Sequence, residues 1–229
     1  WLTGFSASLA RDQITYGIPL VGGDTVSTPG PLTLTLTAMG TVPKGQALRR
    51  NGAIVGDDVY VSGTIGDGAL GLLVALKDIP EISKKDADYL LDRFHYPQSR
   101  GILGERLYGL AHAGADVSDG LAADLEHICR ASGVSAVIQS QLVPLSDPAE
   151  AILNMDAGYF QQVLGGGDDY ELIFSAAPSA ADEISKLSEE IGIQVTRIGS
   201  IIAKTGEDIV IKDAAGEPIP LQQTGFRHF

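Results

Sequence analysis

The sequence predicts a protein of mixed α and β structure, either α/β or α+β. Two patterns indicate it. The segment Leu32–Thr37 alternates leucine and threonine with a period of two residues, as a half-buried strand does. By contrast, Leu121, Leu125 and Ile128 recur at the spacing of one helix face. Such helix-like and strand-like segments alternate along most of the chain, with no internal repeat, which favours a mixed architecture.

The first part of the chain predicts a helix followed by a strand. Leu2–Tyr16 carries apolar residues near helical spacing, and Leu32–Thr37 is the alternating strand. Residues 44–56 are polar and broken by glycines, as linkers are. We therefore place a domain boundary near Pro43. Because the chain opens on Trp1 and enters a helix at once, we expect it to be a fragment of a longer protein.

The second part predicts the remaining alternation of helices and strands. A strand is expected at Asp58–Ser62. The helix expected at residues 84–93 should end before Pro97, because proline cannot continue a helix. The other expected helices are 69–77, 84–93, 101–113, 149–154, 157–164 and 180–191. The other expected strands are 136–138, 170–175, 195–202 and 208–212.

Composition narrows the possible functions. The 229 residues are 44% hydrophobic and carry a formal net charge of -13, so a nucleic-acid partner, which requires a basic stripe, is disfavoured. An acidic chain that handled phosphates would need cations to screen them, and magnesium is the natural candidate. No apolar run is long enough for a membrane span, so we expect a cytoplasmic protein. Cys129 is the single cysteine and is expected to be buried.

Three clusters place carboxylates or glycines between expected elements, where a scaffold can aim them at a ligand. The first is Gly22-Gly23-Asp24-Thr25. Its glycines would let backbone N–H groups approach an anion, and Asp24 would then require a divalent ion between itself and that anion. The alternative is a tight turn with a hydrogen-bonding aspartate.

The second cluster is Asp116-Val117-Ser118-Asp119-Gly120, at the expected end of a strand and the start of a helix. Asp116 and Asp119 offer oxygen ligands suited to a hard cation, while Ser118 and the first N–H groups of the helix could face a phosphate. The alternative, equally weighted from this segment by itself, is that Ser118 or Asp119 merely caps the helix.

The third cluster is Gly165-Gly166-Gly167-Asp168-Asp169-Tyr170-Glu171-Leu172. Three successive glycines lose much conformational entropy on folding, which favours a loop that approaches a cofactor or substrate closely. The alternative is a disordered surface loop, which composition does not exclude.

Common nucleotide and nucleophile motifs are not found. The sequence has no Gly-x-x-x-x-Gly-Lys-Ser/Thr loop, and Gly63–Gly68 lacks the acidic residue that a dinucleotide fingerprint requires. No histidine lies near a nucleophile elbow. The acidic and glycine-rich clusters are therefore the candidate functional segments.

Five segments in order resemble the thiamine-monophosphate kinase family. They are 22–25, 50–57, 116–121, 166–172 and the closing Gly-Phe-Arg-His-Phe of residues 225–229. The resemblance covers the whole chain and implies transfer of the terminal phosphoryl group of ATP to thiamine monophosphate. It also implies the two-domain fold of the aminoimidazole-ribotide synthetase superfamily. Residues 1–43 would be the end of an N-terminal ATP-binding and dimerisation domain, residues 44–229 a C-terminal α/β domain, and the protein a homodimer.

Carried onto this sequence, the resemblance implies a magnesium and nucleotide site. Asp24, Asp116 and Asp119 would hold magnesium, with Asp24 and Asp119 taken as the catalytic residues. The nucleotide would be contacted by Gly23, Asp24, Arg50 and Ser118.

The resemblance also implies a substrate side of the site. Asp168 would face thiamine monophosphate, and Phe226 or Phe229 would lie against its rings, because an aromatic face suits a cationic thiazolium. We take Phe226 as the first choice. Transfer would be direct and in line, since a phosphate monoester is already largely ionised near neutral pH.

The family carries an acidic Gly-Asp-Asp motif and further aspartates before the position of Trp1. We therefore expect these 229 residues by themselves to have weak or no kinase activity. Two other interpretations stay open: another ATP-dependent enzyme of the superfamily with an amide or selenide acceptor, and a non-catalytic nucleotide-binding fragment.

Overall fold

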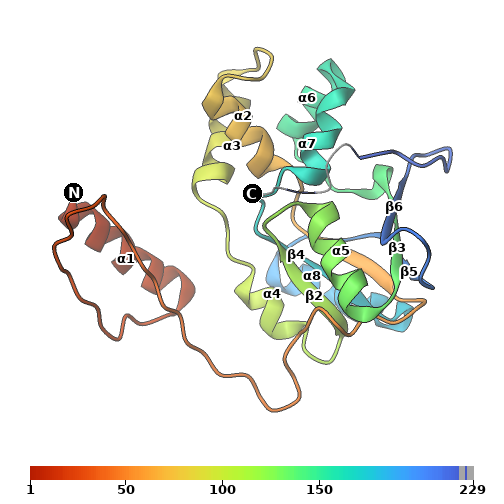
Figure 1. Cartoon of the computed structure of the whole chain (residues 1–229), viewed down its shortest axis with the longest axis horizontal. Coiled ribbons are helices and arrows are strands. Elements are labelled where there is room, and N and C mark those ends of the chain that lie inside the picture. The colour runs from red at the N-terminus through yellow and green to blue at the C-terminus, as the bar shows by residue number, and fades with distance from the viewer. Residues whose placement is uncertain (222–224, 226–229) are drawn as a thin grey trace. The chain divides into compact units, whose positions relative to one another are not determined.

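The computed structural model describes residues 1–221 and 225 (Figure 1). It divides into two compact units, Trp1–Gly45 and Gln46–Phe229, and each is described by itself. Within the described residues, no helix has both the length and the apolar character needed to cross a membrane.

The first unit contains one helix, α1 (Leu2–Tyr16), which ends where Gly17 adopts a φ of 65°. Residues 18–45 form neither helix nor strand, so the strand predicted at Leu32–Thr37 is wrong. Leu32, Leu34 and Leu36 are all exposed. The physical reason is that a strand exists only when another strand accepts and donates its hydrogen bonds. An alternating pattern predicts which face would be buried, but it does not supply the partner.

The second unit is built on a six-stranded sheet in the order β2-β4-β1-β5-β3-β6. Four of its five pairings are antiparallel, and only β3 with β6 is parallel. The strands are β1 (Asp58–Ser62), β2 (Ala111–Val117), β3 (Ser135–Gln139), β4 (Glu171–Ala176), β5 (Val195–Ile202) and β6 (Ile209–Lys212).

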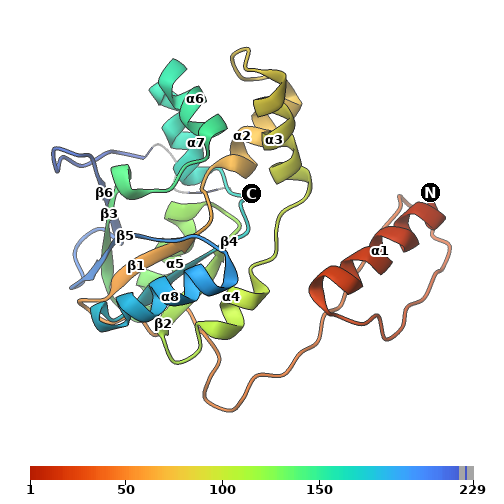
Figure 2. The same cartoon turned by 180° about the vertical axis from the view of Figure 1, so that it is seen from behind.

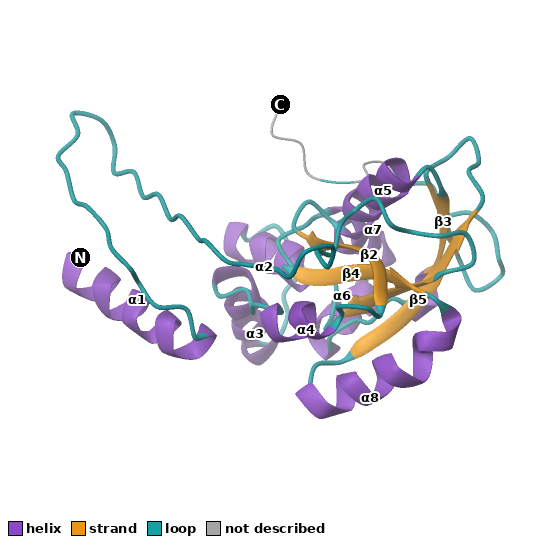
Figure 3. Ribbon diagram, turned by 90° about the horizontal axis from the view of Figure 1, so that it is seen from below, coloured by secondary structure: helices purple, strands orange, loops and turns teal. Residues whose placement is uncertain are grey.

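Helices cover both faces of this sheet, as Figures 1 and 2 show from opposite sides. In Figure 3, α5 and α8 lie on opposite sides of the strands. The helices of this unit are α2 (Asp67–Leu76), α3 (Lys84–His95), α4 (Gly101–Arg106), α5 (Leu121–Ser132), α6 (Asp147–Met155), α7 (Phe160–Gly165) and α8 (Ala181–Ile191). The mixed architecture predicted from the sequence is confirmed.

Two hydrophobic cores follow from the alternation of side chains along the strands. On β1, Val59 and Val61 pack in the larger core with helix α5, while Tyr60 stacks on Phe174 in the smaller core on the other face. Because every residue of β1 is buried, this central strand is covered on both sides. The sheet is therefore a rigid support for the loops at its ends.

One predicted helix is too long. Residues 101–113 were expected to be helical throughout, but α4 ends at Arg106 and β2 begins at Ala111. Gly109, with a φ of 77°, turns the chain between them. Beyond the turn, β2 pairs with β4 from Ala111 onward, and this long-range pairing outweighs the local helical preference of the sequence.

Candidate active site at the carboxyl end of β2

The antiparallel pairing of β2 with β4 brings two of the predicted clusters together. Val117, the last residue of β2, lies opposite Glu171, the first residue of β4. The contact continues into the loops, where the N–H of Tyr170 donates to the carbonyl of Val117 at 2.8 Å and the N–H of Asp168 donates to that of Ser118 at 3.0 Å. The loop after β2 and the glycine-rich loop before β4 are thus held side by side.

Glycines allow these loops to touch backbone to backbone. A β-carbon built on Gly167, whose φ is 74°, would lie 2.3 Å from the carbonyl oxygen of Ser118. At Gly225, a β-carbon would lie 2.3 Å from the β-carbon of Ala123 and 2.7 Å from the carbonyl oxygen of Asp119. Side chains at these positions would separate the segments. The segments 116–121 and 166–172 therefore meet near the start of α5, together with Gly225, the one described residue of the closing motif.

A buried carboxylate shapes the loop after β2. Asp124, in the first turn of α5, is fully buried, and its Oδ2 accepts the N–H groups of Ser118 and Asp119, both at 3.0 Å. The N-cap residue of α5 is Gly120, which has no capping side chain. The alternative that Ser118 or Asp119 caps the helix is therefore wrong. Instead, the side chain of Asp124 in the helix accepts hydrogen bonds from the backbone of the loop, and the side chains of Ser118 and Asp119 do not cap the helix.

Several negative charges gather at this point. Burial raises the pKa of Asp124, two backbone N–H groups lower it, and the charges of Asp119 and Asp116 raise it further. Burial also raises the pKa of Tyr170, as do the nearby carboxylates of Asp168, Asp116 and Asp119. Asp116 and Asp119 thus act electrostatically both on Asp124 in α5 and on Tyr170 in the glycine-rich loop.

The donor atoms here suit a hard cation. Asp119, Asp124 and His127 each offer a ligand atom, and these atoms lie within 4.8 Å of one another. The Oδ1 atom of Asp124 is buried without a hydrogen-bond partner. An unpaired buried carboxylate oxygen is costly unless a proton or a cation satisfies it. Carboxylate oxygens are the preferred ligands of magnesium.

The glycine-rich loop is anchored by two of its three carboxylates, those of Asp169 and Glu171. Asp169 is buried, and it accepts the N–H groups of Gly66 at 2.8 Å and Gly68 at 2.9 Å at the start of α2. Burial raises its pKa to about 7, against the opposing effect of those two N–H groups. The predicted alternative of a disordered surface loop is therefore wrong.

Glu171 is the second anchor. Its buried carboxylate accepts hydrogen bonds from Ser62 at 2.6 Å, from Arg93 at 2.9 Å, and from Nε and Nη2 of Arg100, both at 2.5 Å. The loop is thereby fixed to β1, to α3 and to the segment before α4. Asp168 is left as the one carboxylate of the loop with a partly exposed side chain.

The other predicted residues are not among those that the β2–β4 pairing brings together. Gly23 and Asp24 are exposed in the first unit, where Asp24 Oδ1 accepts the N–H of Thr25 at 2.8 Å. The carbonyl of Arg50 accepts the hydroxyl of Ser132 at 3.0 Å, at the end of α5 opposite Asp119. A helix of this length spans roughly 18 Å, so the backbone of Arg50 is not beside the acidic loops. Phe226 and Phe229 lie outside the described residues.

Sequence reasoning missed Asp124. A signal was present, because Asp124 occupies the helical face that carries Leu121, Leu125 and Ile128, and a carboxylate on an apolar stripe needs buried partners. The buried roles of Asp169 and Glu171 were also missed, since an acidic run gives no direct sign of which members point inward.

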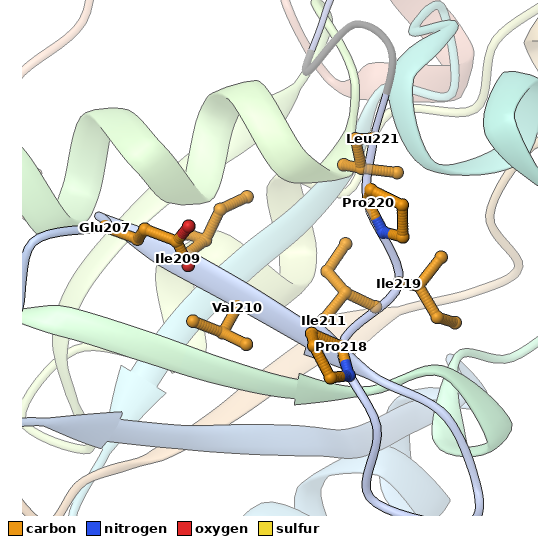
Figure 4. A pocket seen from close by; sticks show the side chains of 8 residues that line it. All are labelled: Glu207, Ile209, Val210, Ile211, Pro218, Ile219, Pro220 and Leu221. Carbon is orange, nitrogen blue, oxygen red and sulfur yellow. The ribbon is translucent and has the colours of Figure 1, made fainter.

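An apolar cavity elsewhere in this unit does not have the lining of a site for magnesium and phosphates. It has a volume of about 500 Å³ and lies between β6 and residues 218–221 (Figure 4). Among the described residues, Glu207 is the one charged residue of its lining, and the others are isoleucine, valine, leucine and proline. None of the predicted site residues that the structure describes lines this cavity, and a carboxylate in an apolar wall does not attract phosphates.

Comparison with known proteins identifies the family. Residues 55–212 match the family described as AIR synthase related protein, C-terminal domain. The chain is 39% identical over 229 residues to the thiamine-monophosphate kinase of Escherichia coli K12, covering all of this chain and 69% of that protein. The chain belongs to the thiamine-monophosphate kinase family.

Solved structures of this family have the same fold. The thiamine-monophosphate kinase of Stenotrophomonas maltophilia K279a matches with a TM-score of 0.69 at 39% identity, over 78% of this chain and 56% of that one. AaThiL complexed with AMPPCP and TMP matches with a TM-score of 0.63 at 30% identity, over 80% of this chain and 54% of that one. The aligned part is thus little more than half of each solved thiamine-monophosphate kinase chain. The predicted aminoimidazole-ribotide synthetase-like fold is confirmed.

Proposed function

We propose that the protein phosphorylates thiamine monophosphate to thiamine diphosphate at the expense of ATP. The observation that carries the proposal is the convergence of Asp116, Ser118, Asp119 and Asp168, which come from two loops that the pairing of β2 with β4 holds together. Membership of the kinase family supports it, as does the relative complexed with AMPPCP and TMP.

Magnesium is the proposed metal, and the donor set fits it. Asp116, Asp119 and, from the first unit, Asp24 would supply carboxylate oxygens, and the unpartnered buried oxygen of Asp124 adds a further negative group behind Asp119. Bound magnesium would screen the charges of two anionic substrates and stabilise charge that develops during transfer.

The chain's own residues would position the reactants. Gly23 and Ser118 would contact the nucleotide, and Arg50, whose backbone lies toward the other end of α5, would contact a different part of it. Asp168 would face thiamine monophosphate, and Phe226 would lie against its rings. The acceptor oxygen then attacks the terminal phosphoryl group in line, and ADP leaves. A general base is unnecessary because the acceptor is a phosphate monoester that is already ionised near neutral pH. A cytoplasmic homodimer is the proposed working form.

The test is a kinase assay of the full-length protein with ATP, magnesium and thiamine monophosphate, with ADP and thiamine diphosphate both quantified. We expect Asp119→Asn to lower kcat by roughly 100-fold, because it removes a carboxylate ligand of the magnesium that would screen the reacting phosphates. Higher magnesium concentrations should restore part of the loss. Asp88→Asn, at an exposed position of α3, is the matched control and should leave kcat unchanged.

Other outcomes separate the remaining interpretations. Turnover with an amide or selenide acceptor, and none with thiamine monophosphate, would identify a different enzyme of the superfamily. If calorimetry detects no magnesium-dependent binding of ATP or of thiamine monophosphate, the protein is a non-catalytic member and the proposal fails.

A further inference from the structure

Two non-glycine residues of the glycine-rich loop have left-handed backbone conformations. Asp168 has a φ of 62° and Tyr170 a φ of 51°. Aspartate tolerates this conformation moderately well, but a bulky aromatic residue rarely adopts it. Such a conformation persists only where surrounding contacts impose it, and it is often found where a side chain serves a ligand.

The contacts that impose it come from the alternate residues. Asp169 and Glu171 are buried and bind α2, α3 and β1 through the hydrogen bonds described above. The backbone N–H groups of Asp168 and Tyr170 are fixed to Ser118 and Val117. Asp169 and Glu171 are buried by these contacts, whereas the side chains of Asp168 and Tyr170 are at least partly exposed.

Tyr170 lies beside the acidic groups of the candidate site. Its side chain is partly exposed, at 42% of its full area, although its neighbours in the chain are buried. Its hydroxyl interacts with the carboxylate of Asp168, and Asp116 and Asp119 are close enough to act on it. An aromatic face among carboxylates is a surface that attracts a flat organic cation.

We propose that Tyr170 is a substrate-contacting residue that selects the acceptor: its hydroxyl orients Asp168, and its ring contacts the cationic ring of the phosphate acceptor. This inference rests on the proposed function, in which the acceptor is thiamine monophosphate with its thiazolium cation. The nucleotide is an anion with a neutral base, so Tyr170 should affect acceptor binding and not ATP binding.

The test compares two variants of Tyr170 in the full-length protein. Tyr170→Phe removes the hydroxyl and keeps the ring. Tyr170→Asn removes the ring and retains a residue that accepts the left-handed backbone. We expect Tyr170→Asn to raise the KM for thiamine monophosphate about tenfold, with the KM for ATP changed less than twofold. Tyr170→Phe should show a smaller increase in the same KM.

Control variants distinguish the loss of a substrate contact from a general loss of folded structure. Tyr108, which has similar exposure and precedes β2 at its opposite end, provides the matched variant Tyr108→Asn, expected to leave both KM values unchanged. Equal increases in both KM values for Tyr170→Asn, or no change in either, would overturn the inference. Should Tyr170→Asn fail to fold, the KM for thiamine monophosphate of Tyr170→Phe decides. A wild-type protein without kinase activity would instead overturn the proposed function.

Discussion

Replacing Glu171 with glutamine tests whether the glycine-rich loop depends on its buried ion cluster. The carboxylate of Glu171 is fully buried and balances the guanidinium groups of Arg93 and Arg100, which are themselves largely buried. Glutamine keeps the shape of the side chain and removes its charge. The nearest other carboxylate, that of Asp67, lies 3.5 Å from Arg93 and already accepts hydrogen bonds from Thr64 and Ser146.

The expected cost follows from leaving buried cations without their counter-charge. Removing one partner of a buried ion pair typically destabilises a protein by about 3–5 kcal/mol. That is a large share of the roughly 5–15 kcal/mol by which domains are stable. With a denaturant dependence of about 3 kcal/mol per molar urea, the unfolding midpoint should fall by about 1–1.7 M.

The measurement is urea unfolding followed by circular dichroism, and the control is the same substitution at an exposed ion pair. Glu190 binds Arg106 at 2.9 Å, but both side chains are about half exposed or more. Exposed pairs contribute little, so Glu190→Gln should leave the midpoint unchanged. If Glu171→Gln lowers the midpoint no more than Glu190→Gln does, the cluster is not what holds the loop.

Two further predictions concern buried titratable groups. Because burial raises the pKa of Asp169 to about 7 in the folded protein, the folded state holds a proton that the unfolded state has lost above about pH 4. The free energy of unfolding of the wild type, compared with that of Asp169→Asn at the same pH, should therefore decrease by about 4 kcal/mol from pH 4 to pH 7 and stay level above pH 7. A difference between the two proteins that does not change with pH over that range would contradict this. The thiol of Cys129 is buried and its pKa is raised to about 12, so we expect no reaction with iodoacetamide at pH 8 until urea unfolds the protein. Rapid alkylation of the native protein would show that this part of α5 opens.

Local patterns were enough to predict most of the second unit. The helix that ends before Pro97 and the apolar face of α5 were predicted because their signals lie within a few residues. Residues 111–113 were assigned to a helix because their pairing partner is some 60 positions further along the chain. The strand prediction at Leu32–Thr37 was wrong because its alternating pattern has no partner strand in the described part of the first unit.

The candidate site was only partly predictable. Asp116, Ser118, Asp119 and Asp168 were selected from their motifs, and the sheet brings their loops together as expected. The motifs did not indicate that Asp169 would be an anchor and Asp168 an exposed group, because adjacent carboxylates look alike in a sequence. In the structure, burial and the hydrogen bonds from Gly66 and Gly68 distinguish Asp169 from the partly exposed Asp168.

Under the proposed function, the contacts along residues 167–171 limit the positions at which the acceptor preference of this protein could be changed. Position 167 has no room for a side chain, and positions 169 and 171 hold the loop to the rest of the unit. Positions 168 and 170 lack these buried contacts, and residues that accept a left-handed backbone, such as asparagine, fit there best. A library randomised at those two positions would explore new acceptors while the supporting framework stays intact.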